Sequence, residues 1–183
     1  MLKLLLKNAG VDPEAFKGAP EDVRRAIQNA KRASTGPESE IYDHLSDNQL
    51  SDNWAMNIFP NLHWSTHSEG MLMLRHEPHR TDPDKCYLHA VVLAYPGMNF
   101  ELYAPAAPNA KREKSGRPSR IRARHDDPDV LEVIGLLLYE DIRNTRETQQ
   151  GMKSRGFSRI RLSEHEQPIM HQHAEIDRYL GIP

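Results

Sequence analysis

The sequence predicts an α+β fold in which an antiparallel sheet packs against long C-terminal helices. Three changes of pattern predict it. Apolar residues recur at helical spacing over residues 1–32, at a period of two from residue 54 to residue 95, and at helical spacing again after residue 129. A run of strands followed by long helices is typical of α+β domains. The chain has 183 residues, which suits one domain or a large piece of one.

The N-terminal helical region is expected in two pieces. Asp12-Pro13-Glu14 has the residues that commonly begin a helix, and Pro20 opens a second segment in which Val23 and Ile27 recur at helical spacing. The polar stretch 34–40 then interrupts the helical pattern.

Three strands are expected next. Residues 54–59 alternate until Pro60 interrupts them, residues 69–76 form a second strand, and residues 86–95 form a third. The turn at 81–85 has Pro and Asp in positions that favour a tight turn. Apolar residues occupy much of both faces of this meander, so another part of the protein must cover it.

Two helices are expected to close the chain. Asp127-Pro128 marks the start of one that runs from near Asp129 past Asp141. Ser163–Glu166 has the form of a capping box and begins the last helix, which Gly181 ends.

Charge and composition exclude several partners. The formal net charge is -2, which gives no general attraction to nucleic acid or to an anionic membrane. No apolar run approaches the roughly 20 residues that span a bilayer, and the N-terminus becomes charged too early for a signal peptide. We therefore expect a cytoplasmic protein.

The basic stretch 105–120 is either a solvated loop, as most short charge runs are, or a docking loop for an acidic partner.

Asp141 is the acidic residue with the most informative position. On a helical wheel that begins at Val130, apolar residues form one face, and Asp141 falls near its middle, seven residues after Ile134. Glu140 lies to the side of that face. A carboxylate directed at a core must be paired, hydrogen-bonded or bound to metal. The pattern alone leaves open a frayed helix end, a buried ion pair and a metal ligand.

The ten histidines include no strong metal motif. His63 and His67 share a face in a strand-like region, where their separation is wider than on a helix. His173 continues the apolar stripe of the last helix and is expected to be a core residue.

Cys86 is the one cysteine, which excludes an internal disulfide, and we expect it to be a buried apolar residue rather than a nucleophile.

Short motifs follow one another along the chain in a fixed order. They are Gly10–Pro13 and Val23-Arg24, residues 52–61 ending in Phe59-Pro60-Asn61, Arg75–Pro78, the turn Asp82–Asp84, Glu140-Asp141 with a Q-x-G-x-x-S continuation at Gln149–Ser154, and the closing segments Leu162–His173 and Tyr179–Gly181. In this order they resemble the FPN strand, acidic helix and closing helix of Rieske-type non-haem iron ring-hydroxylating oxygenase α subunits. The resemblance covers nearly the whole chain and implies that residues 1–183 are the C-terminal portion of the catalytic domain.

The resemblance implies a partial helix-grip (START-like) fold and mononuclear Fe(II) held by two histidines and one carboxylate, which would be Asp141. The intact enzyme would use O2 to hydroxylate an aromatic or other apolar substrate, with electrons from a ferredoxin or reductase. Asn61, His63, Leu74 and His76 would form the sheet side of the substrate pocket. The remainder of the α subunit would be a partner of this chain, and the complete subunit is expected to form a homo-oligomer.

The chain departs from the family in two respects. The iron histidines of the family precede every segment matched here, and no histidine occurs before His44. A Rieske [2Fe–2S] cluster takes two cysteines and two histidines, which a chain with one cysteine cannot supply. We therefore expect the Rieske domain and the iron-histidine segment to be absent from this chain, and the chain alone to be inactive.

Two other interpretations stay open. A helix-grip binding module would hold an apolar ligand without metal or redox chemistry, and it has no need for Asp141 on an apolar face. An inert remnant would fold poorly because part of its sheet is missing. An essential role of Asp141 in metal binding would separate the oxygenase interpretation from both.

Overall fold

The computed structural model describes residues 2–95, 122–128 and 130–182, which belong to two compact units, Met1–Asn99 and Phe100–Pro183. Each unit is described by itself. Within the described residues, no helix has the length and apolar content needed to cross a membrane.

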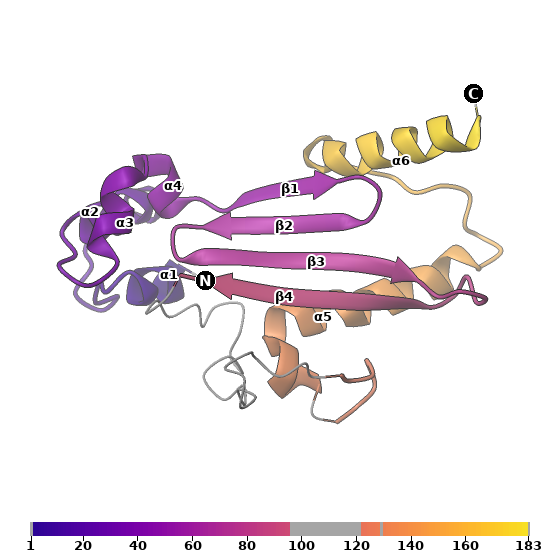
Figure 1. Ribbon diagram of the computed structural model, residues 1–183, viewed down its shortest axis with the longest axis horizontal. Coiled ribbons are helices and arrows are strands. Elements are labelled where there is room, and N and C mark those ends of the chain that lie inside the picture. Colours follow the sequence, from indigo (N-terminus) through magenta and orange to yellow (C-terminus); the bar gives the residue numbers. More distant parts are fainter. Residues whose placement is uncertain (1, 96–121, 129, 183) are drawn as a thin grey trace. The chain divides into compact units, whose positions relative to one another are not determined.

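The sheet of the N-terminal unit is an antiparallel meander with the strand order β1-β2-β3-β4 (Figure 1). Its strands are β1 Trp54–Ile58, β2 Leu62–His67, β3 Gly70–Pro78 and β4 Cys86–Ala94. The turn before β4 follows the predicted chemistry, because the Asp82 carboxylate accepts a hydrogen bond of 3.0 Å from the backbone N–H of Asp84.

The strand register sorts the side chains onto two faces. The histidine face carries Ala55, Asn57, His63, Ser65, Leu72, Leu74, His76, Leu88, Ala90 and Val92. The tryptophan face carries Trp54, Met56, Ile58, Trp64, Met71, Met73, Arg75, Glu77, Tyr87, His89, Val91 and Leu93. Every exposed large apolar residue of the four strands lies on the tryptophan face, whereas the buried Ser65 and Leu72 lie on the histidine face.

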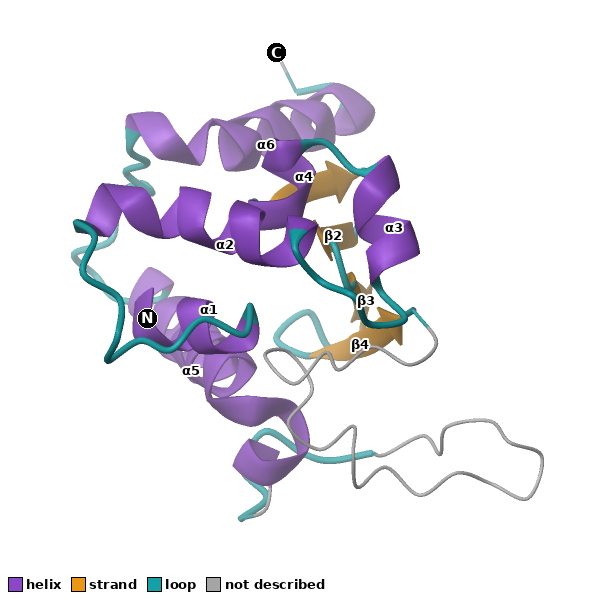
Figure 2. Ribbon diagram, turned by 90° about the vertical axis from the view of Figure 1, so that its left-hand side faces the viewer, coloured by secondary structure: helices purple, strands orange, loops and turns teal. Residues whose placement is uncertain are grey.

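The helices of the N-terminal unit gather at the end of the sheet where β1 begins and β2 turns into β3 (Figure 1). They are α1 Leu2–Asn8, the 3-10 helix η1 Pro20–Asp22, α2 Val23–Arg32, α3 Ser39–His44 and α4 Asp47–Ser51. Helix α1 lies beside α2 (Figure 2), and Leu6, Val23 and Ile27 form the buried core between them. Burial of these side chains stabilises the helical end by roughly 1.5–3 kcal/mol for each large apolar residue.

A buried polar cluster ties these helices to the β2–β3 turn. Lys31 of α2 forms an ion pair with Glu69 and donates a hydrogen bond of 2.7 Å to the Ser68 hydroxyl. The Tyr42 hydroxyl of α3 donates to the same Glu69 oxygen at 3.0 Å. Burial raises the pKa of Glu69, but Lys31 and the hydrogen bonds outweigh it and hold that pKa below its usual value. Burial and Glu69 together raise the pKa of Tyr42.

The C-terminal unit contains α5 Val130–Met152, the 3-10 helix η3 Glu164–Glu166 and α6 Gln167–Leu180. The predicted capping box at its last helix is present, because the Ser163 N–H donates to the Glu166 carboxylate at 2.6 Å. Gly181 ends α6 with φ 69°, as predicted for a residue in the left-handed region. Gly135 interrupts α5 with φ 77° and ψ 164°, so α5 is two helical pieces joined at a kink.

Several local predictions were wrong. The sheet has a fourth strand, β2, whose histidine face is polar and therefore lacks the apolar alternation of its neighbours on that side. Asp12 does not begin a helix; its carboxylate accepts from the Glu14 N–H at 2.9 Å and closes a turn. The short helices α3 and α4 were not predicted.

Three further expectations were neither confirmed nor contradicted. The basic stretch 105–120 lies outside the described residues. The packing of the Asp141-bearing helix across the sheet stays a prediction, as does the helix-grip arrangement. The antiparallel sheet with long C-terminal helices confirms the α+β class.

Replacing Glu69 with Gln should destabilise the N-terminal unit. The substitution leaves Lys31 charged and without its carboxylate, and the two side chains are only 12% and 21% exposed. We expect the free energy of unfolding to fall by about 3 kcal/mol, as for breaking a buried ion pair. Trp54 and Trp64 are the only tryptophans and both lie in this unit, so tryptophan fluorescence in denaturant measures its unfolding.

The control is Glu14→Gln, which breaks the exposed Lys3–Glu14 pair and should leave stability unchanged. The pH dependence gives a second readout. Because the pKa of Glu69 is lowered on folding, its stabilisation is present above the ordinary value of 4.5 and is lost as the pH falls through the folded value. The free energy of unfolding of Glu69→Gln should therefore not show this loss as the pH falls. Equal losses in both variants would contradict the importance of the buried pair.

Candidate functional site

The candidate site lies on the histidine face of the sheet, around His63. The register places His63 directly opposite Leu74, and the Asn61–His76 pair continues the same ladder. His63, Leu74 and His76 therefore share one face, whereas Asn61 lies in the turn just before β2. A one-residue slip of the register would turn them to the opposite face.

His63 is held by its neighbours in one tautomer. Its Nδ1 lies 2.6 Å from the Asn57 side-chain oxygen. That oxygen can only accept, so Nδ1 carries the hydrogen, and in the neutral ring Nε2 has a lone pair. The Ser65 hydroxyl lies 3.5 Å from Nε2. The His63 ring thus presents a hydrogen-bond acceptor on the histidine face.

The electrostatics of the site favour a neutral His63. Burial lowers the pKa of His63, and the neighbouring His76 lowers it further because two positive charges on adjacent strands repel. A neutral imidazole can accept a hydrogen bond or bind a metal through Nε2, which an imidazolium cannot.

Asn61 and His76 are joined through two hydrogen bonds. The Asn61 side-chain N–H donates to the His76 carbonyl at 2.6 Å, and the His76 backbone N–H donates to the Asn61 carbonyl at 3.0 Å. The side-chain bond fixes the Asn61 amide against β3. These contacts lock the polar end of the face in register with β3.

Aliphatic side chains continue the histidine face beyond its polar end. Leu74 and the buried Leu72 lie on β3, and on β4 Val92 lies opposite Leu72 and Leu88 lies opposite His76. A face with a few fixed polar groups beside an apolar surface suits an apolar ligand that carries one or two hydrogen-bonding groups.

Asp141 lies in α5, in the helical piece after the kink. It is exposed, as is Glu140, and its backbone carbonyl accepts a hydrogen bond of 2.8 Å from the Thr145 hydroxyl. The helical wheel assumed one unbroken helix from Val130, whereas Gly135 resets the phase between Ile134 and Asp141. A helical wheel that begins at Val130 therefore does not predict the face of α5 on which Asp141 lies.

The residues that the structure describes do not bring a complete metal site together. No group of three or more His, Cys, Asp or Glu side chains among them could hold a metal ion. A three-ligand iron site does not fit these residues alone, and Asp141 offers one carboxylate at most.

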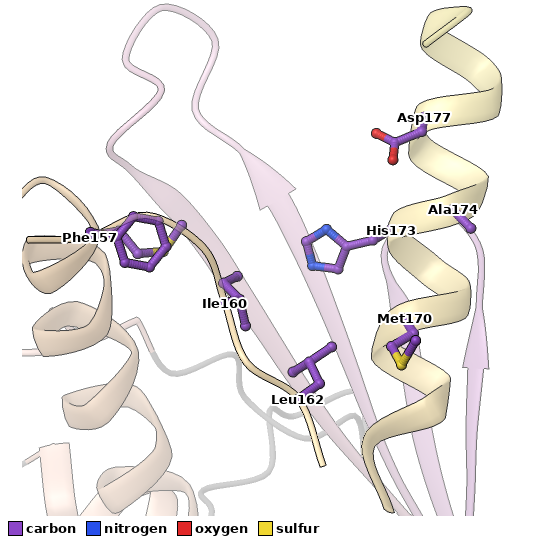
Figure 3. A pocket seen from close by; sticks show the side chains of 8 residues that line it. Phe157, Ile160, Leu162, Met170, His173, Ala174 and Asp177 are labelled. Carbon is purple, nitrogen blue, oxygen red and sulfur yellow. The ribbon is translucent and has the colours of Figure 1, made fainter. Parts of the chain in front are cut away.

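The C-terminal unit contains a separate groove of about 480 Å³ (Figure 3). His173 and Asp177 project from α6 toward the side where Ile160 and Leu162 lie (Figure 3). Its lining is completed by Met152, Phe157, Met170 and Ala174. All lining residues except Leu162 are exposed, so the groove is open to solvent.

Two expectations about single residues were wrong. His173 is exposed and lines this groove, so it is no core residue. Cys86 is exposed because it begins the edge strand β4, where one side of the strand has no neighbour within the described residues.

Sequence reasoning missed the two residues that orient His63. Asn57 and Ser65 lie on the neighbouring and the same strand, and neither belongs to a recognisable motif. The available signal was the polar residues His63, Ser65 and His67 at alternate positions, with the apolar residues Leu62 and Trp64 beside them. It identifies a strand with one polar face, and the pairing partner of each residue then depends on the register.

Comparison with known proteins identifies the family. A family model described as ring hydroxylating alpha subunit (catalytic domain) matches residues 8–182. No curated protein and no solved structure matches the chain. Since the match spans nearly every residue, this chain belongs to the family of ring-hydroxylating oxygenase α subunits, within its catalytic domain.

Proposed function

We propose that this chain contributes part of an oxygenase site that uses mononuclear Fe(II) and O2 to hydroxylate an aromatic or other apolar substrate. Membership of the family supports the reaction class, which is oxidation. The histidine face supports the substrate class, because it joins an aliphatic surface to a neutral imidazole and a fixed amide. This face is the single observation on which the proposal depends most.

In this proposal, Asp141 supplies the carboxylate of the iron site and Asn61, His63, Leu74 and His76 line the substrate pocket. Bound Fe(II) would supply the activation of O2. The chain's own residues would position the substrate: Leu74 by apolar contact and His63 by accepting a hydrogen bond at Nε2.

The partners and the location belong to the same proposal. The remaining iron ligands would come from the rest of the α subunit, and electrons from a ferredoxin or reductase through a [2Fe–2S] cluster outside this chain. The complete subunit would be a cytoplasmic homo-oligomer. On its own, the chain would catalyse no hydroxylation.

Iron binding tests the role of Asp141. One carboxylate leaves a hard cation mostly to water, so the isolated chain should retain well under one iron per chain after dialysis. In a longer polypeptide that joins this chain to an iron-histidine segment of the family, Asp141→Ala should abolish iron retention. Elemental analysis of the dialysed proteins measures both.

Glu140→Ala is the matched control, because it removes the neighbouring exposed carboxylate. It should leave iron retention largely intact. If iron retention requires Glu140 and not Asp141, then Glu140 is the iron ligand. If neither carboxylate matters, the alternative of a metal-free binding module for an apolar ligand is the better account.

The protonation state of His63 tests the substrate-facing site. NMR titration of the ring protons should give His63 a pKa below the ordinary value of 6.5, because burial and His76 both oppose its charge. His76→Gln removes the neighbouring charge and should raise the pKa of His63. His44→Gln, a change in the exposed end of α3, should leave it unchanged. A His63 pKa at or above 6.5 in the unmodified chain contradicts the described site.

A further inference from the structure

Asn57 of β1 lies directly opposite His63 of β2. The His76 N–H donates to the Asn61 carbonyl, so the backbone of His63, two residues further along β2, also bonds to β3. The backbone groups of His63 therefore point away from β1. Asn57 and His63 form a non-hydrogen-bonded pair, which is the kind of pair in which opposite side chains lie closest. The contact between these two side chains thus follows from the register.

The contact fixes where the hydrogen of the His63 ring lies. Asn57 Oδ1 is 2.6 Å from His63 Nδ1, and an amide oxygen can only accept. The tautomer with its hydrogen on Nε2 would bring two acceptors together at this distance and lose the hydrogen bond. The hydrogen bond at one ring nitrogen decides the role of the other. Asn57 therefore keeps Nε2 of the neutral ring as an acceptor.

The Nε2 acceptor is open to a ligand. Ser65 Oγ lies 3.5 Å from Nε2, whereas hydrogen bonds in proteins are about 2.7–3.2 Å long. His63 is half-buried, so part of its ring is accessible on the histidine face. A ligand that donates an O–H or N–H can bond to Nε2 at a shorter distance than Ser65 does. An ether or carbonyl oxygen cannot, because Nε2 has no hydrogen to donate.

We propose that Asn57 is a positioning residue that makes the histidine face select apolar ring compounds carrying a hydrogen-bond donor, such as a phenol-type O–H. The proposal rests on the proposed function, because it takes this face as the surface that binds the substrate. Leu72 and Leu74 supply the apolar surface beside His63, and the donor of the ligand bonds to Nε2. Asn57 does not touch the ligand and acts through the His63 ring.

The first test measures the tautomer of His63. Long-range 15N–1H spectra of the full chain distinguish a hydrogen on Nδ1 from one on Nε2, at about pH 8, where an imidazole is neutral. The unmodified chain should show the Nδ1–H form. Asn57→Leu removes the acceptor and should give a mixture of both forms, whereas Asn57→Asp keeps an acceptor and should restore Nδ1–H. Ser65→Ala is the control and should leave the tautomer unchanged.

The second test measures ligand preference with two probes of the same ring size. The oxygen of 2-naphthol carries a hydrogen, and the oxygen of 2-methoxynaphthalene can only accept. NMR titration of the unmodified chain should show about threefold to tenfold tighter binding of 2-naphthol, the range of one hydrogen bond. Asn57→Leu should reduce this preference by about twofold or more, because only a fraction of the His63 rings then presents Nε2 as an acceptor. Asn57→Asp should restore the preference, and Ser65→Ala should not change it.

The outcomes separate this inference from the proposed function. If naphthalene and both probes bind to the histidine face without preference for 2-naphthol, the inference is overturned and the proposed function stands. Saturable binding of none of the three compounds overturns both. An Nε2–H tautomer in the unmodified chain, no rescue by Asn57→Asp, or equal effects of Asn57→Leu and Ser65→Ala would overturn the inference alone. Circular dichroism and tryptophan fluorescence establish that each variant is folded.

Discussion

The buried ion pair between Lys31 and Glu69 is the contact on which the N-terminal unit depends. It joins the longest helix of that unit to the turn between β2 and β3, and Tyr42 and Ser68 complete it. Because Glu69 directly precedes β3, the pair fixes where β3 begins. Side chains alternate along a strand, so the start of β3 decides which of them reach each face.

The histidine face follows from that constraint. With β3 in its observed register, Leu74 lies opposite His63 and His76 lies opposite Asn61. His76 then lowers the pKa of His63 from the adjacent strand. The two polar groups and the aliphatic surface beside them are the surface that we propose for an apolar substrate. Family membership gives the reaction class.

The sequence predicted the parts of the structure that have strong periodicity or clear caps. β1, β3 and β4 alternate over five to nine residues, and the last helix has a capping box at its start and Gly181 at its end. β2 was missed because polar His63 and Ser65 fill the positions where the other strands are apolar. Its recognition requires the pairing partners, which are long-range contacts that no local pattern contains.

The sequence predicted only part of the candidate site, because the pairing of strands is a long-range contact that no local pattern contains. The parity of Leu74 and His76 follows from one strand, and the register places His63 on the same face, whereas the role of these residues and of Asn61 in a substrate pocket stays a prediction. Asn57 was not predicted as a partner of His63, because that contact depends on the β1–β2 register. The phase of Asp141 was not predictable from a helical wheel, because Gly135 adopts φ 77° in the middle of the apolar stripe.

We propose that the histidine face is the surface that meets an aromatic substrate. The most direct measurement is an NMR titration of the full chain with naphthalene. We expect saturable chemical-shift changes at Asn61, His63, Leu74 and His76, with the Trp54 and Met56 signals of the opposite face unchanged. Changes confined to the tryptophan face or to the groove at His173, or no saturable change at any residue, would contradict it.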